Sequence, residues 1–170
     1  MKKYYVTSDE HYGHKNIIKY CNRSFDSIEE MNQTIIDNHN KIVTEEDTTI
    51  HVGDFTLKSK TYAIDIIHKL NGSHMFIKGS HDYWLDQKHM TRLEKKIYDN
   101  FIVFDHYAMR VWPRSHHNSI LLFGHSHGGL KSFGKSMDVG VDTNNFYPYS
   151  IERVVSLMRN KPDNFNLVRR

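Results

Sequence analysis

The sequence has few of the features that mark secreted, membrane-spanning or multidomain proteins. Its 170 residues include one cysteine, Cys21, so an internal disulfide is excluded and a reducing cytoplasm is the expected location. No apolar run approaches the ~20 residues that are needed to cross a bilayer. Acidic and histidine residues interrupt the N-terminal region before an apolar signal segment can form, so we expect neither a signal peptide nor a membrane partner. With three prolines, no linker rich in proline or glycine and no internal repeat, the sequence predicts one domain, residues 1–170.

The chain also carries little net charge. The formal net charge is +3, and the lysines and arginines are scattered along the chain. A surface that binds nucleic acid is normally more basic, which disfavours this class, although a nucleic-acid partner remains open as an alternative. Histidine, in contrast, is abundant: the chain has 13, several of them near aspartate or glycine. The hydrophobic content of 38% suits a globular protein.

Apolar periodicity predicts alternating strands and helices. Ser27 and Glu30 have the spacing of a capping box, which predicts that a helix begins there. The expected helices lie at 28–42, 63–70 and 83–98 and after Ser150, and the expected strands at 4–8, 48–54, 74–78, 101–104, 108–112, 118–125 and 136–141. This order, β-α-β-α-β-α followed by further strands, is typical of a layered α/β domain in which helices cover a mixed sheet.

Polar side chains follow the predicted strands at the points where the strands end. Asp9, Asp54, His81, His106 and His125 each come just after an apolar run. In α/β folds the loops at the carboxyl ends of strands meet at one crevice. Residues that are far apart in the sequence are therefore expected to lie in one place.

These residues have the chemistry of metal ligands. Carboxylate and neutral imidazole suit divalent transition metals. Two cations that are held roughly 3.5–4 Å apart repel each other, so a shared anionic ligand between them is favourable, and Asp54 is the natural candidate. Taken singly, each fragment is more often a surface turn or a helix cap. Five fragments in this order, each after a strand, favour a metal site.

As a set, the fragments Asp9-Glu10-His11, Gly53-Asp54, Gly79-Ser80-His81-Asp82, His106 and Gly124-His125-Ser126-His127 resemble the motifs of the calcineurin-like metallophosphoesterases. The stretches SDEHYGHKNII and MDVGVDTNNFYPYS are similar to those of the small bacterial and phage-type members. The resemblance implies a four-layer α/β/β/α sandwich with mixed sheets and a dinuclear metal centre. It implies two divalent metal ions, with manganese as the first expectation and iron, zinc, nickel or cobalt as alternatives.

The resemblance also implies roles for individual residues. It assigns Asp9, His11 and His127 to the first metal and His106 and His125 to the second, with Asp54 between the two. His81 would lie near the scissile phosphate as a proton donor or charge stabiliser, and Asp82 would orient it. His14 and Asn16, which follow the first motif, are expected on the substrate side, with a local cap as the equal alternative for His14. Asp138 and Asp142 are expected to shape a loop beneath the metals.

Ser80 departs from the family pattern, which has asparagine at this position as a ligand of the second metal. A serine hydroxyl is shorter than a carboxamide and is a poorer neutral donor to a cation. We retain Ser80 in the ligand set as a tolerated or weakened ligand, because every other ligand type is intact. An introduced change and a lapsed catalyst are the alternatives.

The expected function is hydrolysis of phosphate esters by a hydroxide that the two metals activate. Within this class the resemblance to small single-domain members favours a phosphodiesterase acting on a small molecule or nucleotide. A phosphomonoesterase or protein phosphatase of the same superfamily is one alternative. A non-catalytic scaffold on this fold, with a weakened second metal site, is the other.

Overall fold

Three of the predicted strands form most of the first sheet. The computed structural model describes residues 2–164, and in it β1 (Tyr4–Thr7), β2 (Thr48–Val52) and β3 (Ser73–Ile77) are parallel neighbours. The two-residue strand β8 (Tyr149–Ser150) joins the β1 edge in antiparallel orientation, which gives the order β3-β2-β1-β8. All five residues of β2 are buried, as expected for a central strand that is covered on both faces.

The second sheet has the order β4-β5-β6-β7. Its strands are β4 (Arg92–Ile97), β5 (Asn100–Asp105), β6 (Ile120–Phe123) and β7 (Ser136–Asp138). Strands β4 and β5 form an antiparallel hairpin through Tyr98 and Asp99, whose φ values of 47° and 63° fit a two-residue turn that follows the twist of the strands. Strands β5, β6 and β7 are parallel. Both sheets are thus mixed, as predicted.

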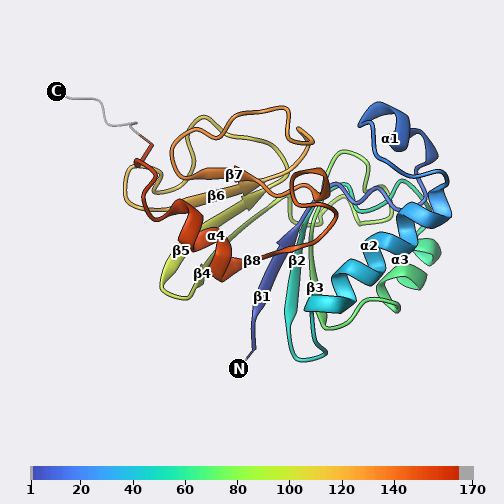
Figure 1. Ribbon diagram of the computed structural model, residues 1–170. Helices are drawn as coiled ribbons and strands as arrows, with labels where there is room; N and C mark the ends of the chain where they lie inside the picture. Colours follow the sequence, from blue (N-terminus) through green and yellow to red (C-terminus); the bar gives the residue numbers. More distant parts are fainter. Residues whose placement is uncertain (1, 165–170) are drawn as a thin grey trace.

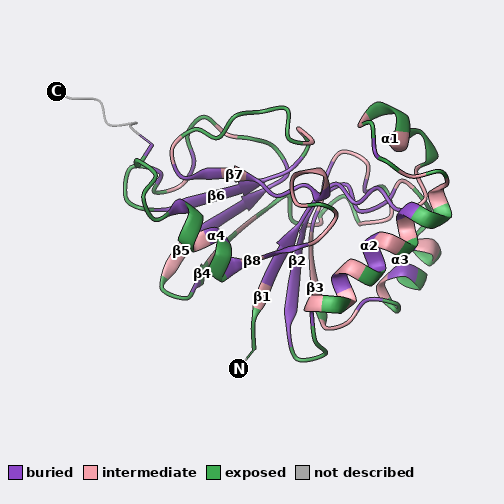
Figure 2. Ribbon diagram, in the orientation of Figure 1, coloured by how far each residue is buried: buried purple, intermediate pink, exposed green. Residues whose placement is uncertain are grey.

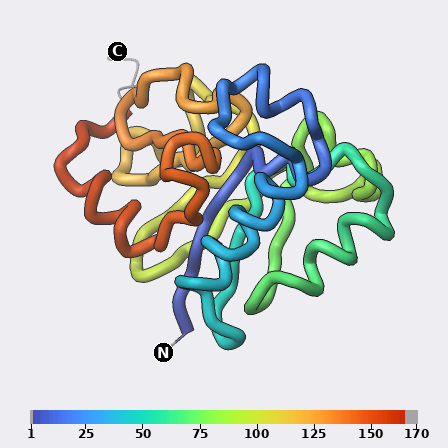
Figure 3. The backbone as a smooth tube through the Cα atoms, turned by 45° about the vertical axis from the view of Figure 1, so that its right-hand side comes forward, coloured from blue at the N-terminus to red at the C-terminus, as the bar shows by residue number. Residues whose placement is uncertain are grey.

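Helices α2 (Ile28–Ile42) and α3 (Lys60–Ile67) cover the outer face of the first sheet. The two helices lie side by side in both views of the chain (Figures 1 and 3). Ser27 caps α2 by accepting a hydrogen bond from the Glu30 backbone N–H at 3.1 Å, and the Glu30 carboxylate accepts one from the Asp26 N–H. A short helix, α1 (Lys15–Tyr20), follows β1. The core on this side contains buried residues from all three helices, among them Ile17, Met31, Ile35, Ala63 and Ile66.

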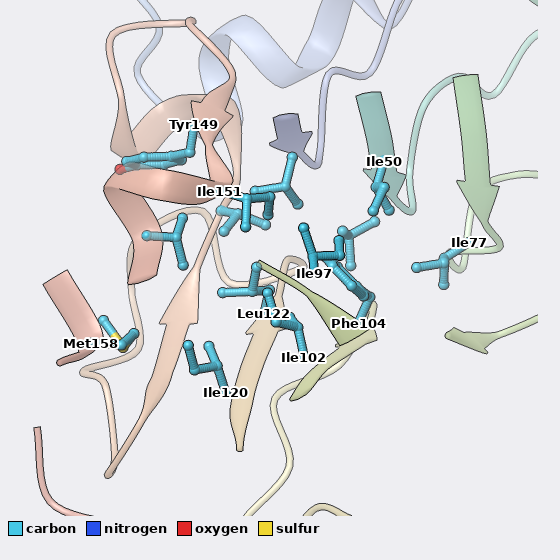
Figure 4. Packing of buried hydrophobic residues seen from close by; sticks show 14 residues of the cluster. Ile50, Ile77, Ile97, Ile102, Phe104, Ile120, Leu122, Tyr149, Ile151 and Met158 are labelled. Carbon is cyan, nitrogen blue, oxygen red and sulfur yellow. The ribbon is translucent and has the colours of Figure 1, made fainter. Parts of the chain in front are cut away.

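The main core lies between the two sheets. Ile50 and Ile77 of the first sheet lie opposite Ile102, Phe104 and Leu122 of the second (Figure 4). Val6 of β1 belongs to the same almost fully buried cluster. Helix α4 (Ile151–Met158), capped by Ser150, packs against β1 and β8 and adds Ile151, Val154 and Met158 to the same cluster. Burial of each such side chain contributes about 1.5–3 kcal/mol. Figure 2 shows the corresponding pattern on α2 and α4, which have one buried and one exposed side.

A turn-rich segment, residues 107–119, follows β5 and supplies the apolar cover of the second sheet's outer face. Trp112 of this segment packs with Val103, Leu121 and Phe123 of the sheet. The predicted layered α/β architecture with mixed sheets is confirmed. Among residues 2–164 no helix is both long and apolar enough to span a membrane. Residue 1 and residues 165–170 of the predicted 1–170 domain lie outside the described part of the chain.

Two predicted elements are wrong. The helix expected at 83–98 is a series of turns followed by strand β4, in which exposed residues alternate with more buried ones. This period of two is that of a strand, and Trp84 packs against Phe55 and Phe76 and not along a helix face. The strand expected at 108–112 is part of the turn-rich segment. Helix α1 and strand β8 were not predicted, because six and two residues are too few to show a period.

The fold brings the carboxyl ends of the strands together. A parallel bridge between Ser8 and Gly140 connects the end of β1 with the end of β7. The Asp9 N–H donates to the Gly53 carbonyl at 3.0 Å, and the Gly124 N–H donates to the His106 carbonyl at 3.1 Å. The loops that follow β1, β2, β3, β5 and β6 therefore meet at one end of the two sheets. These loops carry the residues that the sequence predicted as metal ligands.

Candidate metal centre

Tight backbone turns aim the side chains of these loops at one another. Asp9, His11, Asp54, His125 and His127 all have left-handed φ values, between 46° and 67°. Residues other than glycine rarely adopt this conformation, which costs on the order of 1–3 kcal/mol and clusters at functional sites. Main-chain hydrogen bonds stabilise these strained conformations, such as the one from the His11 N–H to the Asp54 carbonyl at 3.0 Å.

Two glycines allow the loops to approach closely. A Cβ atom at Gly53 would lie 2.7 Å from the His106 Cγ and 2.8 Å from the Gly79 Cα. Gly53 also has a φ of 92°, which other residues avoid. The glycines of the Gly-Asp and Gly-Ser motifs are therefore needed for Asp54 to lie beside His106, because a side chain at either position would clash.

The first donor group consists of Asp9, His11 and His127. One ligand atom from each lies within 4.8 Å of the others. The His127 Nδ1 lies 2.7 Å from a carboxylate oxygen of Asp142, which fixes the ring and leaves Nε2 for a ligand. Both ring nitrogens of the buried His11 have no hydrogen-bond partner among the described residues. Buried polar atoms are normally paired, so this orphaned imidazole fits a metal ligand.

The second donor group consists of Asp54, His106 and His125, again within 4.8 Å of one another. The His106 Nδ1–H donates to the Val52 carbonyl at 2.9 Å, which fixes the tautomer and points Nε2 toward Asp54. His125 donates its backbone N–H to both carboxylate oxygens of Asp9, at 3.0 and 2.9 Å. The two donor groups are thus directly connected.

Asp54 lies where the two groups meet. Its Oδ2 is 3.3 Å from the His106 Nε2, 3.9 Å from the His11 Nε2 and 4.0 Å from the His81 Nε2. One carboxylate oxygen therefore faces imidazoles of both groups. This position suits the shared ligand that the sequence predicted.

The charges at the centre are strongly coupled. Burial alone would raise the pKa of Asp54, but His106 and the N–H of His81 hold it below its ordinary value. Burial lowers the pKa of His106, but the hydrogen bond and charge of Asp54, the charge of Asp9 and the Val52 carbonyl together raise it to about 9. Burial raises the pKa of Asp9 to about 7 and lowers that of His11 to about 3. The metal-free centre therefore holds a proton on His106 that a bound cation would displace.

Arg23 supports the centre and was missed by the sequence prediction. Its guanidinium is buried and donates two hydrogen bonds to the Asp142 carboxylate, at 2.7 and 2.8 Å, in a bidentate pair. It also donates to the Asp9 and Glu10 carbonyls at 2.7 and 3.1 Å. Arg23 thus fixes the loop that carries Asp9 and, through Asp142, the ring of His127. A single arginine has no periodic signal in the sequence, so only the structure shows this contact.

Asp82 organises the loop after β2. Its carboxylate accepts hydrogen bonds from the backbone N–H groups of Asp54, Phe55, Thr56 and Gly79 and from the Trp84 indole, at 2.7–3.3 Å. Its hydrogen bonds in the described structure do not include the His81 ring. The contacts indicate that Asp82 positions Asp54.

Other predicted residues lie around the opening of the centre. The His81 side chain is 41% exposed, and its ring centroid is 5.6 Å from that of His11. His14 is half-buried at the start of α1, with its ring 5.4 Å from His11 and 6.4 Å from His81. Asn16 is exposed on α1. His14 and His81 therefore flank the same side of the first donor group, whereas Asn16 is not drawn into it.

Ser80 contacts the shared carboxylate. Its hydroxyl donates to Asp54, at 3.2 Å from Oδ2 and 3.4 Å from Oδ1. The serine therefore stays beside the second donor group and holds Asp54 in place. As a whole, the residues present fit divalent cations: each of the two sets combines one carboxylate with two imidazoles, and Asp54 of the second set lies 3.9 Å from the His11 Nε2 of the first. Both ring nitrogens of His11 and the Nε2 of His106 lack a hydrogen-bond partner among the described residues.

Comparison with known proteins gives the family and the fold. No family model matches the chain. The uncharacterized protein MJ1445 of Methanocaldococcus jannaschii is 33% identical over 170 residues, which cover 93% of this chain and 92% of that protein. The crystal structure of the protein of unknown function AQ665 from Aquifex aeolicus has a TM-score of 0.72 at 23% identity and covers 92% of this chain and 100% of that chain. This likeness shows a shared fold. A Streptococcus pneumoniae protein called a predicted phosphoesterase has a TM-score of 0.46 at 16% identity, covering 82% of this chain and 71% of that one.

Proposed function

The chain belongs to the same family as protein MJ1445 of Methanocaldococcus jannaschii, and we propose that it is a metal-dependent phosphoesterase. The observation that carries this proposal is the pair of donor groups, Asp9-His11-His127 and Asp54-His106-His125, arranged on either side of one shared carboxylate. We propose manganese as the ion in both sites, with iron, zinc, nickel or cobalt as alternatives. Paired divalent cations supply an acidified water and offset the charge of a phosphoryl group when they are bound.

The protein side chains divide the remaining tasks. Asp54 accepts hydrogen bonds from the Ser80 hydroxyl and the His81 N–H, which hold its carboxylate beside the imidazoles of His106 and His11. His81 is partly exposed above Asp54, where it can donate a proton to a leaving oxygen or stabilise phosphoryl charge. His14 lies beside His81 and can contact the same phosphate. Asp82 fixes the loop that carries Asp54.

Charge at the centre favours a phosphodiester over a phosphomonoester. A monoester carries one more negative charge, which an additional cationic side chain would have to offset. Arg23 contacts the loop of Asp9, but it is buried and already paired with Asp142. We therefore propose phosphodiesterase activity, with monoester or phosphoprotein hydrolysis as the alternative.

The scaffold alternative rests on Ser80 alone. The side chains of both donor groups are gathered at one site, and a protein that only binds a partner has no need of a strained His11 whose buried ring has no hydrogen-bond partner among the described residues. These observations support the enzyme over the scaffold.

The test is hydrolysis of bis-p-nitrophenyl phosphate and p-nitrophenyl phosphate by the protein loaded with Mn²⁺, Ni²⁺, Co²⁺ or Zn²⁺. We expect turnover of the diester, and a loss of about 100-fold or more in kcat for Asp54→Ala and His81→Ala. His116→Ala, in the exposed part of the segment 107–119, is the matched histidine control and should keep full activity. If the wild-type protein hydrolyses neither ester with any metal, the scaffold reading replaces the proposal.

A further inference from the structure

A cavity of about 570 Å³ opens beside the second donor group. Ser80 and His106 form the wall that the cavity shares with the metal centre, and the remaining walls come from the segments 78–92 and 105–109. The volume is within the range of small-molecule sites, roughly 300–1,000 Å³. The cavity is therefore positioned to receive the group that is esterified to a phosphate at the metal centre.

The wall nearest to the metal centre is aromatic. The Tyr107 ring packs edge-on against His106 and His125, with ring centroids 5.0 and 4.8 Å apart, and the residue is 47% exposed. The backbone N–H of Tyr107 donates to the Asp105 carboxylate at 3.0 Å, which fixes the start of this segment. Tyr107 thus presents an ordered ring to the cavity, next to the donor side chains.

The cations of the cavity are already engaged. The Arg92 Nε donates to the Asp105 carboxylate at 3.0 Å, and one of its terminal nitrogens lies 3.1 Å from the Met109 sulfur. The Lys78 ammonium donates to the Leu85 and Asp86 carbonyls at 3.2 and 3.1 Å. The Tyr107 ring and the Met109 side chain supply the apolar part of the lining, beside polar groups that include Gln87 and Thr91. Such a lining suits a flat ring with hydrogen-bonding edges.

We propose that this cavity is a subsite for the base of a nucleotide ester, which stacks on Tyr107 while the phosphate lies at the metal centre. The inference rests on the proposed function and deepens it: the substrate class becomes nucleoside phosphodiesters.

The experiment measures binding to the Mn²⁺-loaded protein by calorimetry, with adenosine 5′-monophosphate and ribose 5-phosphate as probes. The two differ at C1 of the ribose, where the nucleotide carries adenine and the sugar phosphate a hydroxyl group. Stacking on an aromatic side chain predicts about tenfold tighter binding of the nucleotide. Tyr107→Ala should remove this difference. Tyr107→Leu, which keeps an apolar side chain beside the histidines but has no ring, should remove it as well.

Tyr83→Ala is the matched control, because Tyr83 is 76% exposed and does not line the cavity. This variant should keep the tenfold difference. Equal binding of the two probes to the wild-type protein would overturn the subsite, and so would a difference that persists in both cavity variants. In each of these cases diester hydrolysis by the wild-type protein would still stand. Absence of hydrolysis with every metal would instead remove the proposed function itself.

Discussion

Replacement of Asp54 by asparagine should reduce the number of protons released on metal binding by about one at pH 7. In the wild-type protein the Asp54 carboxylate raises the pKa of His106 to about 9. At pH 7 the ratio of protonated to neutral His106 is then about 100 to 1. An imidazole must be neutral to bind a cation, so loading of the second donor group releases this proton.

The first donor group adds to the release. Asp9, whose pKa burial raises to about 7, is about half protonated at pH 7. His11, with a pKa lowered to about 3, contributes none. Filling both groups should therefore release at least about one and a half protons. Without the carboxylate of Asp54, only Asp9 and the Val52 carbonyl oppose the effect of burial, which is the largest on His106, so the pKa of His106 falls and its share of the release is largely lost.

The assay is calorimetric titration of the metal-free protein with Mn²⁺ at pH 7 in buffers of different ionisation enthalpy. The slope of the observed enthalpy against the ionisation enthalpy gives the number of protons. Asp99→Asn is the control, because this exposed carboxylate is paired with Lys96 on the hairpin between β4 and β5. It should leave both affinity and proton release unchanged. A wild-type release near zero, or an equal release from Asp54→Asn, would refute the coupling of Asp54 with His106.

Three further predictions concern stability and affinity. The pKa of His106 is higher in the folded than in the unfolded protein, so protonated His106 stabilises the metal-free protein fully below about pH 6.5, and this stabilisation is lost as the pH rises through about 9. Over this range the unfolding free energy of the wild-type protein should fall by about 3 kcal/mol relative to that of Asp54→Asn. Urea-unfolding free energies that change with pH in parallel in the two proteins would contradict this. Arg23→Met removes the buried bidentate pair and leaves the Asp142 carboxylate with His127 as its remaining side-chain partner, so it should cost about 3–5 kcal/mol in urea unfolding. Arg92→Met, which breaks a more exposed pair, should cost less than about 1 kcal/mol, and equal losses in the two variants would contradict a special contribution of Arg23. Ser80→Asn should tighten Mn²⁺ binding at the second donor group and raise turnover, by up to about tenfold, and unchanged or weaker binding would count against a weakened ligand at this position.

The sequence predicted those parts of the fold that periodicity and strand-end residues describe. Strands β1, β2, β3, β5 and β6 and helices α2, α3 and α4 lie near their predicted places. The candidate ligands lie together because parallel strands place their carboxyl ends at one edge, which the order of the motifs already indicated. Their role as ligands stays a prediction.

The parts that were not predicted depend on tertiary contacts. Trp84 and the residues before Arg92 form turns because Asp82 and the Trp84 indole connect this loop with the end of β2, a contact that no local pattern marks. The hydrogen bond between Asp142 and His127 agrees with the expectation that Asp142 shapes the loop beneath the metals. Asp142 also pairs with Arg23, which is 119 residues away in the sequence. Contacts over such distances have no signature in a single sequence.

The most direct measurement is anomalous diffraction at the manganese absorption edge from crystals of the Mn²⁺-loaded protein. We expect two neighbouring peaks, one within bonding distance of Asp9, His11 and His127 and the other within bonding distance of His106 and His125, with Asp54 reaching both. A single peak away from Asp54, or no bound manganese at these residues, would contradict a dinuclear centre at this site.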